Sequence, residues 1–207
     1  LTWETKSPER MLSEFEYYAS QGVDTIECYD STMVTPPSRM AAFAALARAR
    51  GLRIRWHCYA HAAHLQQTEL TDAMFAAGCR SVSIGVESCD ESVLRRMRKA
   101  VSRAALRRAF ANCTRAGLVC AANVIVGFPG ETRDTVRRTV EGLIDLDPDT
   151  VGIQAFQVRD RTIPVLRLDN AHLEVADGSL PYWRHDGMDR DLAVRLAQQA
   201  MWEVAVG

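Results

Sequence analysis

The apolar residues of this 207-residue chain change their spacing repeatedly, from every second residue to every third or fourth. The first spacing is typical of strands and the second of helices. Five stretches with strand spacing alternate with helical stretches, at intervals of roughly 30 residues. Because a helix that connects two strands in this way makes a right-handed crossover, the pattern predicts an α/β fold with a parallel sheet, either open or curled into a barrel.

The same periodicity predicts where each element lies. We expect strands over residues 23–29, 52–59, 81–86, 118–126 and 150–158. We expect helices over residues 9–20, 38–50, 69–77, 90–98, 102–116, 131–146 and 189–204. The pattern loosens beyond Pro164, so we divide the chain into a core, residues 1–165, and a C-terminal extension, residues 166–207. Within the extension, Pro181-Tyr-Trp-Arg-His has two interpretations, a substrate-facing segment or a packing segment.

Composition narrows the class of protein. The 25 basic and 26 acidic side chains give a net charge of −1, which argues against nucleic-acid binding through overall positive charge. No apolar run approaches the roughly 18–20 residues that a membrane span needs, and no signal peptide is recognisable. The six cysteines are too far apart for a CxxC pair and are expected to be reduced thiols. We therefore expect a soluble cytoplasmic protein. Because residue 1 is Leu, we also expect that the chain is a fragment of a longer protein.

Polar residues collect at the predicted carboxyl ends of the strands, where parallel sheets bind their ligands. These positions are Asp30, residues 58–61, Glu87 with Ser88, residues 127–131 and residues 157–159.

The sequence Gly127-Phe128-Pro129-Gly130-Glu131-Thr132 is the sharpest local feature. Two glycines and a proline between a strand and a helix let backbone approach a ligand closely, and Glu131 or Thr132 could cap the helix. The GK[ST] ending of a phosphate-binding loop is absent. The alternative interpretation is a tight turn followed by a capped helix.

Single charged residues each have two interpretations. Glu87 could accept hydrogen bonds from a sugar diol, or it could cap a helix or form a salt bridge. Asp30 has the same two interpretations, ligand carboxylate or cap. Most arginines between residues 95 and 108 are expected on solvated helix faces, with Lys99 the exception among the basic residues there.

Three histidines, His57, His61 and His64, raise the question of a metal. His57 and His61 fall on a strand pattern, where side chains four residues apart are about 13 Å apart. No carboxylate or cysteine completes a set with His61 and His64, so a zinc site is not favoured.

Taken in order, these stretches resemble the radical S-adenosylmethionine superfamily, particularly the group in which a cobalamin-binding domain often precedes the radical domain. The resemblance covers roughly residues 1–165. It rests on Ser7-Pro-Glu-Arg, Asp30-Ser-Thr-Met, Arg55-Trp-His-Cys-Tyr-Ala, Ala77-Gly-Cys, Gly85-Val-Glu-Ser, Val93-Leu-Arg-Arg-Met-Arg-Lys and Val126-Gly-Phe-Pro-Gly-Glu-Thr. Each stretch alone is weakly specific, whereas their order and spacing are strongly specific.

The resemblance implies a partial (β/α)6 TIM-like barrel, with strands two to six present, that holds a 4Fe-4S cluster and S-adenosylmethionine. Reductive cleavage of S-adenosylmethionine at the cluster would give a 5′-deoxyadenosyl radical that attacks a substrate C–H bond, with methyl transfer as one outcome. Cobalamin is implied by the subgroup alone. The implied partners are a small-molecule or peptide substrate and an electron donor such as flavodoxin or ferredoxin.

The resemblance also assigns cofactor contacts. Asp30 and Ser31 would lie near the methionine end, and Glu87 with Ser88 would bind the ribose hydroxyls. Lys99 is a weaker candidate for the methionine carboxylate, and Gln157 is a further cofactor-side candidate. The backbone of Val126, Gly127, Phe128, Pro129 and Gly130 would lie beside the adenine, with Glu131 holding that turn.

The chain departs from the family pattern in two places, of which the first matters more. The CxxxCxxC loop that binds the cluster is absent, and the family often has Arg where His61 stands. We expect the loop to have been lost by truncation, and the chain alone to be inactive. The alternatives are a cluster-less barrel that acts as a binding or scaffolding module, and an ordinary barrel enzyme that uses Asp30, Glu87 and a histidine as acid–base groups.

Overall fold

The computed structural model describes residues 4–31, 33–158, 172–175 and 182–206. Its contacts group these residues into two compact units. Unit 1 contains residues 1–85 and 104–121, and unit 2 contains residues 86–103 and 122–207. The expected boundary between core and extension, residues 165 and 166, lies outside the described residues, so that division stays a prediction.

Five strands form the main sheet in the order β1-β2-β3-β4-β5. Their bounds are β1 Thr25–Cys28, β2 Arg55–Ala60, β3 Cys79–Glu87, β4 Val119–Val126 and β5 Thr150–Ala155. The pairs β1–β2 and β2–β3 are parallel, with Thr25 opposite Arg55 and Cys58 opposite Val82. The strands follow one another in the sheet in the same order as in the sequence. Successive crossover connections of the same handedness produce this order.

Helix α1 precedes β1, one or two α-helices lie between consecutive strands of this sheet, and α7 comes at the end of the chain. The bounds are α1 Pro8–Ser20, α2 Pro37–Ala49, α3 Thr68–Ala76, α4 Glu91–Arg96, α5 Arg103–Ala116, α6 Arg133–Leu146 and α7 Arg190–Val206, with a 3₁₀ helix, η1, at Ala62–Leu65. The expected strands and helices are all present, with ends that differ by a few residues. The largest differences are that β2 begins at Arg55 rather than residue 52, and that β5 ends at Ala155 rather than residue 158.

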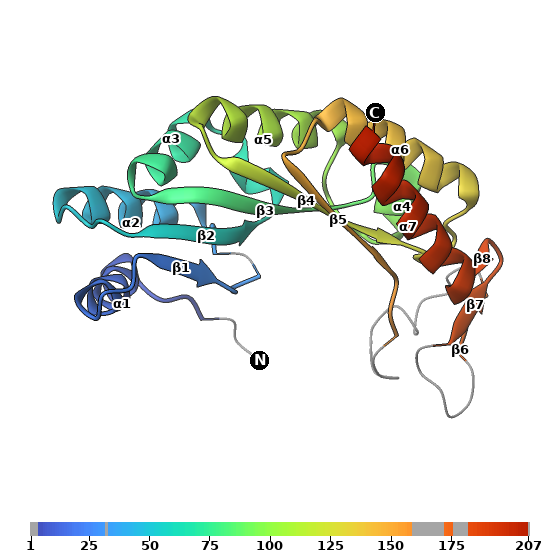
Figure 1. Ribbon diagram of the computed structural model, residues 1–207, viewed down its shortest axis with the longest axis horizontal. Helices are drawn as coiled ribbons and strands as arrows, with labels where there is room; N and C mark the ends of the chain where they lie inside the picture. The colour runs from blue at the N-terminus through green and yellow to red at the C-terminus, as the bar shows by residue number, and fades with distance from the viewer. Residues whose placement is uncertain (1–3, 32, 159–171, 176–181, 207) are drawn as a thin grey trace. The chain divides into compact units, whose positions relative to one another are not determined.

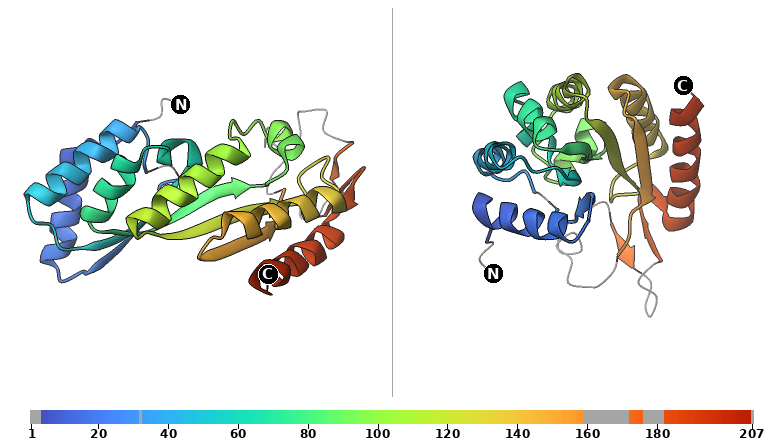
Figure 2. Two further views of the ribbon diagram at one scale, coloured as in Figure 1. Left: turned by 90° about the horizontal axis from the view of Figure 1, so that it is seen from above. Right: turned by 60° about the vertical axis from the view of Figure 1, so that its left-hand side comes forward.

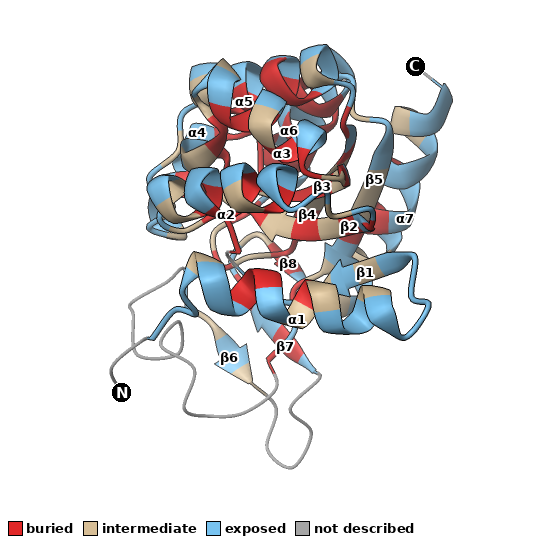
Figure 3. Cartoon of the chain, turned by 90° about the vertical axis from the view of Figure 1, so that its left-hand side faces the viewer, coloured by how far each residue is buried: buried red, intermediate tan, exposed pale blue. Residues whose placement is uncertain are grey.

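The core of unit 1 is built on aromatic side chains. Phe15 of α1, Phe43 of α2 and Trp56 of β2 meet edge to face, with ring centroids 5.1 to 6.2 Å apart. The indole Nε1 of Trp56 donates to the carbonyl of Ala77 at 2.9 Å, so the buried polar atom is satisfied. Helices α2, α3 and α5 lie along one face of β2 and β3 (Figure 1), and α1 shows buried turns next to exposed ones (Figure 3).

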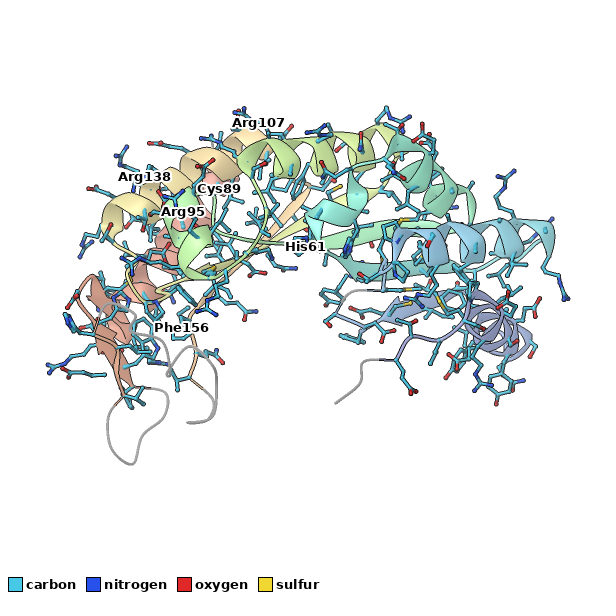
Figure 4. The ribbon with its side chains drawn as sticks, turned by 180° about the vertical axis from the view of Figure 1, so that it is seen from behind. His61, Cys89, Arg95, Arg107, Arg138 and Phe156 are labelled. Atoms are coloured by element: carbon cyan, nitrogen blue, oxygen red, sulfur yellow. The ribbon has the colours of Figure 1, made fainter. Side chains whose placement is uncertain are left out.

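In unit 2, α6 packs closely on the segment that follows β3. Gly142 of α6 lets the helix approach, because a Cβ there would lie 2.3 Å from the Cβ of Cys89. Arg138 Nε donates to Oδ2 of Asp90 at 2.6 Å, while Asp90 caps α4 through the amides of Ser92 and Val93. Figure 4 labels Arg138, Cys89 and Arg95 in this region. Helix α7 lies beside α6 and β5 (Figure 2).

Unit 2 also contains a second sheet that the periodicity did not predict. It is antiparallel, with β6 Glu174–Val175, β7 Trp183–His185 and β8 Met188–Asp189 in that order. Strands of two or three residues are too short to show a period in the sequence. The dipeptide Asp186-Gly187 between Trp-Arg-His and Met-Asp was the available signal, because such dipeptides favour tight hairpins.

All six cysteines are free, and five of them are buried. Burial raises the pKa of Cys28 and of Cys89 to about 12. None of the described helices has the length and apolar character needed to cross a bilayer.

Candidate functional site

Glu87 ends β3 in an unusual backbone conformation. Its φ is +63°, and the amide of Ser88 donates to the carbonyl of Val86 at 2.8 Å, which closes a three-residue turn around Glu87. Such a γ-turn with positive φ is rare and strained for a residue with a Cβ. Backbone strain of this kind clusters at active sites and ligand-binding segments.

The Glu87 carboxylate meets Lys99, which follows α4. Lys99 Nζ lies 2.7 Å from Glu87 Oε1, and the two side chains are 13% and 25% exposed, for Lys99 and Glu87 respectively. The chain reaches Lys99 through Arg98, whose φ is +54°, and the Lys99 amide donates to the carbonyl of Leu94. The salt-bridge interpretation of Glu87 is therefore confirmed, and the pair remains open to solvent along one side.

Ser88 is engaged differently. It is fully buried, and its hydroxyl shares a hydrogen bond of 2.8 Å with Thr139 of α6 and accepts from the amide of Asp90 at 3.0 Å. The structure therefore places Glu87 at the surface of the site and Ser88 beneath it, where the hydroxyl ties the strand end to α6.

The turn after β4, Gly127–Gly130, is held by Glu131. Gly127 and Gly130 have φ values of +95° and +88°, which favour glycine. Glu131 is 1% exposed, and its Oε2 accepts from the amide of Gly127 at 2.5 Å. Glu131 thus closes the turn, whereas Thr132 caps α6 in a reciprocal pair of hydrogen bonds with Thr135.

Glu131 is also electrostatically unusual. Its Oε1 is buried without a hydrogen-bond partner among the described residues. Burial raises the pKa of this carboxyl to about 7, although the amides of Gly127 and Phe128 act in the opposite direction. A carboxyl in this position is costly when ionised.

The hairpin β7–β8 packs on the Gly127–Gly130 turn. Trp183 Nε1 donates to the carbonyl of Phe156 at 3.0 Å, and the Trp183 ring stacks on His185 at a centroid distance of 5.5 Å. A Cβ on Gly127 would lie 2.6 Å from Trp183 Cη2. The packing interpretation is therefore confirmed for Trp183 and His185, which the sequence did not single out as site residues; Pro181 lies outside the described residues.

The remaining predicted contacts in unit 2 have varied exposure. Val126 is buried, and its carbonyl accepts from the amide of Phe156 at 2.7 Å. Pro129 is buried, whereas Phe128 is half-buried and packs edge to face on Phe156, which Figure 4 labels. Gln157 is exposed two residues beyond the end of β5.

In unit 1, Asp30 and Ser31 follow β1 and are both exposed. Asp30 lines a cavity of about 340 Å³ together with Cys28, Met33 and Arg39. The Arg39 guanidinium donates to the carbonyl of Met33 at 2.6 Å and shapes one wall of this cavity.

The three histidines of unit 1 are used locally. His57 lies within hydrogen-bond distance of Ser81 and Ser83, His61 accepts from the amide of Ala63 at the start of η1, and His64 meets Thr35. Within the described part of the chain, no group of three or more His, Cys, Asp or Glu residues has the geometry to hold a metal ion.

Residues 2–143 match the family model of the radical SAM superfamily. The chain belongs to this superfamily. The match covers α1 to most of α6, and with it both Glu87 and the Gly127–Gly130 turn.

Two of the chain's relatives are named as methyltransferases. The chain is 27% identical to an uncharacterized methyltransferase of Pyrococcus horikoshii over 148 residues, which are 71% of this chain and 32% of that protein. It is 28% identical to tryptophan 2-C-methyltransferase of Streptomyces laurentii over 117 residues, 53% of this chain and 19% of that protein. The chain thus spans a third or less of the length of these two relatives.

The solved structures confirm the expected fold. The radical S-adenosylmethionine methyltransferase TsrM of Kitasatospora setae, solved with cobalamin and a [4Fe-4S] cluster bound, superposes with a TM-score of 0.68 at 22% identity. The superposition covers 73% of this radical SAM chain and 31% of that one. The expected partial (β/α)6 barrel, strands two to six, corresponds to β1–β5.

The residues present fit the two family cofactors unequally. The carboxylate of Glu87 suits the adenosyl half of S-adenosylmethionine, because a carboxylate can accept hydrogen bonds from a diol. The space that Gly127 and Gly130 leave free is taken by Trp183 and Arg96, so the glycines shape the turn itself. A 4Fe-4S cluster does not fit these 207 residues. They contain no CxxxCxxC, and the described residues contain no cluster of metal ligands.

Proposed function

We propose that this chain supplies the S-adenosylmethionine-binding part of a radical SAM enzyme. Glu87 would accept hydrogen bonds from the ribose hydroxyls, and the backbone of residues 126–130 would lie against the adenine. The observation that supports the proposal is that Glu87, in a strained backbone conformation, ends β3, while the turn at residues 127–130 follows the neighbouring strand β4. Ligands of parallel sheets bind at this edge.

Each group in unit 2 has a defined task in this proposal. Glu87 binds the diol through charge-assisted hydrogen bonds, which are stronger than neutral ones. Lys99 keeps the carboxylate in place and adds positive charge where a methionine carboxylate would lie. Glu131 holds the amide of Gly127 and so fixes the path of the turn. Phe128 adds apolar surface beside the base and excludes water.

S-adenosylmethionine, when bound, supplies the adenosyl or methyl group from which the reactions of this family start. The chain's own residues bind and orient it. Asp30, Ser31, Ser88 and Gln157 stay proposed cofactor contacts on the resemblance alone.

For the whole protein we propose methyl transfer or another modification of a C–H bond. Two relatives named as methyltransferases support this proposal, as does the fold shared with a cobalamin-binding methyltransferase. A small molecule or peptide would be the substrate, a flavodoxin or ferredoxin the electron donor, and the cytoplasm the location. Cobalamin would then be a second cofactor, held by residues outside this chain.

Calorimetric titration with 5′-methylthioadenosine tests the proposal, because this probe carries the adenosine half without the amino acid. We expect saturable binding to the chain, and Glu87→Gln should weaken it at least tenfold through loss of a charged acceptor. Glu91→Gln is the matched control, since Glu91 is an exposed carboxylate on α4. Equal affinities for wild type and Glu87→Gln would show that Glu87 does not bind the ribose.

A further inference from the structure

The hairpin β7–β8 lies beyond residue 143, where the family match ends, yet it is built into the turn at Gly127–Gly130. The ring of Trp183 fills the space beside Gly127, and its Nε1 donates to the carbonyl of Phe156, whose amide donates to Val126. The hairpin is therefore joined through hydrogen bonds and ring contacts to the last residue of β4 and the first residue of the turn.

His185 makes the polar contacts. Its Nε2 lies 3.3 Å from the carbonyl of Gly127, and its Nδ1 lies 3.1 Å from the amide of Gly187 and 3.5 Å from that of Gly130. Because a carbonyl only accepts and an amide N–H only donates, the ring carries its proton on Nε2 and is neutral. Burial lowers the pKa of His185, which favours the same neutral form.

The fit between hairpin and turn is close on both sides. A Cβ on Gly187 would lie 1.9 Å from the carbonyl oxygen of Glu131, so the hairpin reaches this position only with glycine. The guanidinium side chain of Arg96 from α4 lies against Gly130, 2.8 Å from where a Cβ would stand. The turn is thus enclosed between α4 and the hairpin.

We propose that His185 is a positioning residue for the cofactor turn: its Nε2–H holds the carbonyl of Gly127, and the backbone of residues 127–130 is thereby preset to receive the adenosyl group. This role rests on the proposed function and extends it to the C-terminal extension. A preorganised backbone loses less entropy when the ligand binds, so loss of the His185–Gly127 hydrogen bond should weaken ligand binding.

Three variants of His185 separate this role from simple support of the hairpin. His185→Phe keeps a ring to stack on Trp183 and removes both nitrogens. In His185→Gln the amide can still reach the carbonyl of Gly127, while the Nδ1 acceptor for Gly187 is lost. In His185→Asn the side-chain oxygen replaces Nδ1 toward Gly187, while the contact to Gly127 is lost. Arg184→Gln is the matched control, because Arg184 lies exposed on the same strand and pairs with Glu174.

The measurement is the Kd for 5′-methylthioadenosine together with the Tm of each variant. We expect His185→Phe and His185→Asn to bind about five- to tenfold more weakly, with His185→Gln close to wild type and Arg184→Gln unchanged. Affinity that follows Tm instead, with His185→Asn near wild type and His185→Gln weak, would overturn the positioning role, as would equal affinities throughout. If Glu87→Gln weakens binding while the His185 variants do not, only this inference fails. If wild type does not bind the probe, or Glu87→Gln binds it as tightly, the proposed function fails, and this inference with it.

Discussion

Lys99 Nζ lies 2.7 Å from Oε1 of Glu87, and each residue reaches the pair through a left-handed backbone position, at Glu87 itself and at Arg98. Arg98 takes this conformation as the residue that ends α4, because its amide donates to the carbonyl of Arg95 and the amide of Lys99 donates to that of Leu94. The end of the helix thus delivers Lys99 to the carboxylate of Glu87. The pair also lies beside the helix, α4, whose Arg96 contacts Gly130. The carboxylate and the turn that we propose as cofactor contacts are therefore supported by the same short helix.

The first prediction concerns the strength of this pair. In a double-mutant cycle with Lys99→Met and Glu87→Gln, urea unfolding should give a coupling energy of about 1 kcal/mol or more, because both side chains are largely shielded from water. The pair Arg137–Glu141 has the same 2.7 Å separation with 63% and 56% exposure, and serves as control. Its coupling should be about 0.3–0.5 kcal/mol. Equal coupling in the two pairs would contradict the account.

The second prediction concerns the backbone of Glu87. Because its φ is +63°, Glu87→Gly should be more stable than Glu87→Ala by about 1 kcal/mol. The order should reverse at Arg108, an exposed position within α5, where Ala should exceed Gly by about 1 kcal/mol. Chemical denaturation of the four variants measures both differences. An advantage of Ala at position 87 would mean that this residue is not held in the left-handed region.

The third prediction concerns the contact between turn and hairpin. Gly127→Ala should cost about 3 kcal/mol or more, because the new Cβ would meet both Trp183 and Ala193 at 2.6 Å and φ is +95°. Gly51→Ala is the control for backbone strain alone, since φ there is +64° and no atom lies within 4 Å. It should cost about 1 kcal/mol. Similar costs in thermal unfolding would show that Trp183 does not pack on the turn.

The fourth prediction concerns how the free energy of unfolding depends on pH because of Glu131. Its pKa is about 7 in the folded chain and near 4.5 in the unfolded chain, so the folded state binds the extra proton between these values. Stability is therefore lost as pH rises from 4.5 through 7, by an amount on the order of 3 kcal/mol. Glu131→Gln removes this loss.

The measurement is the unfolding free energy of wild type and Glu131→Gln at pH 5 and at pH 8. The variant should gain about 2–3 kcal/mol relative to wild type between the two pH values. Glu141→Gln, at an exposed position of α6, should gain nothing. A difference between Glu131→Gln and wild type that stays constant with pH would show that Glu131 is ionised at low cost.

Much of this arrangement could be predicted from the sequence. The spacing of the apolar residues predicted the five strands of the main sheet. Because ligands of parallel sheets bind at the carboxyl ends of the strands, it also predicted that Glu87 and the Gly127–Gly130 turn lie at that edge. The interpretation of Glu131 as the residue that holds the turn is confirmed by its hydrogen bond to Gly127. The partner of Glu87 was not predicted, because the path from α4 to Lys99 depends on the left-handed turn at Arg98, which no local pattern announces.

The β7–β8 hairpin could not be predicted from the apolar periodicity of the sequence. Periodicity needs more residues than β7 and β8 contain, and the burial of His185 and Trp183 depends on contacts with a turn more than 50 residues earlier in the chain. The Asp186-Gly187 dipeptide would have indicated the hairpin itself. What it packs on could be learned only from the folded chain, because such tertiary contacts have no local signal.

The most direct test of the central claim is a crystal structure of the protein with S-adenosylhomocysteine bound. The account predicts that both ribose hydroxyls lie within hydrogen-bond distance of the Glu87 carboxylate and that the adenine lies against residues 126–130. A ligand bound elsewhere, with Glu87 and the turn free of contact, would contradict it.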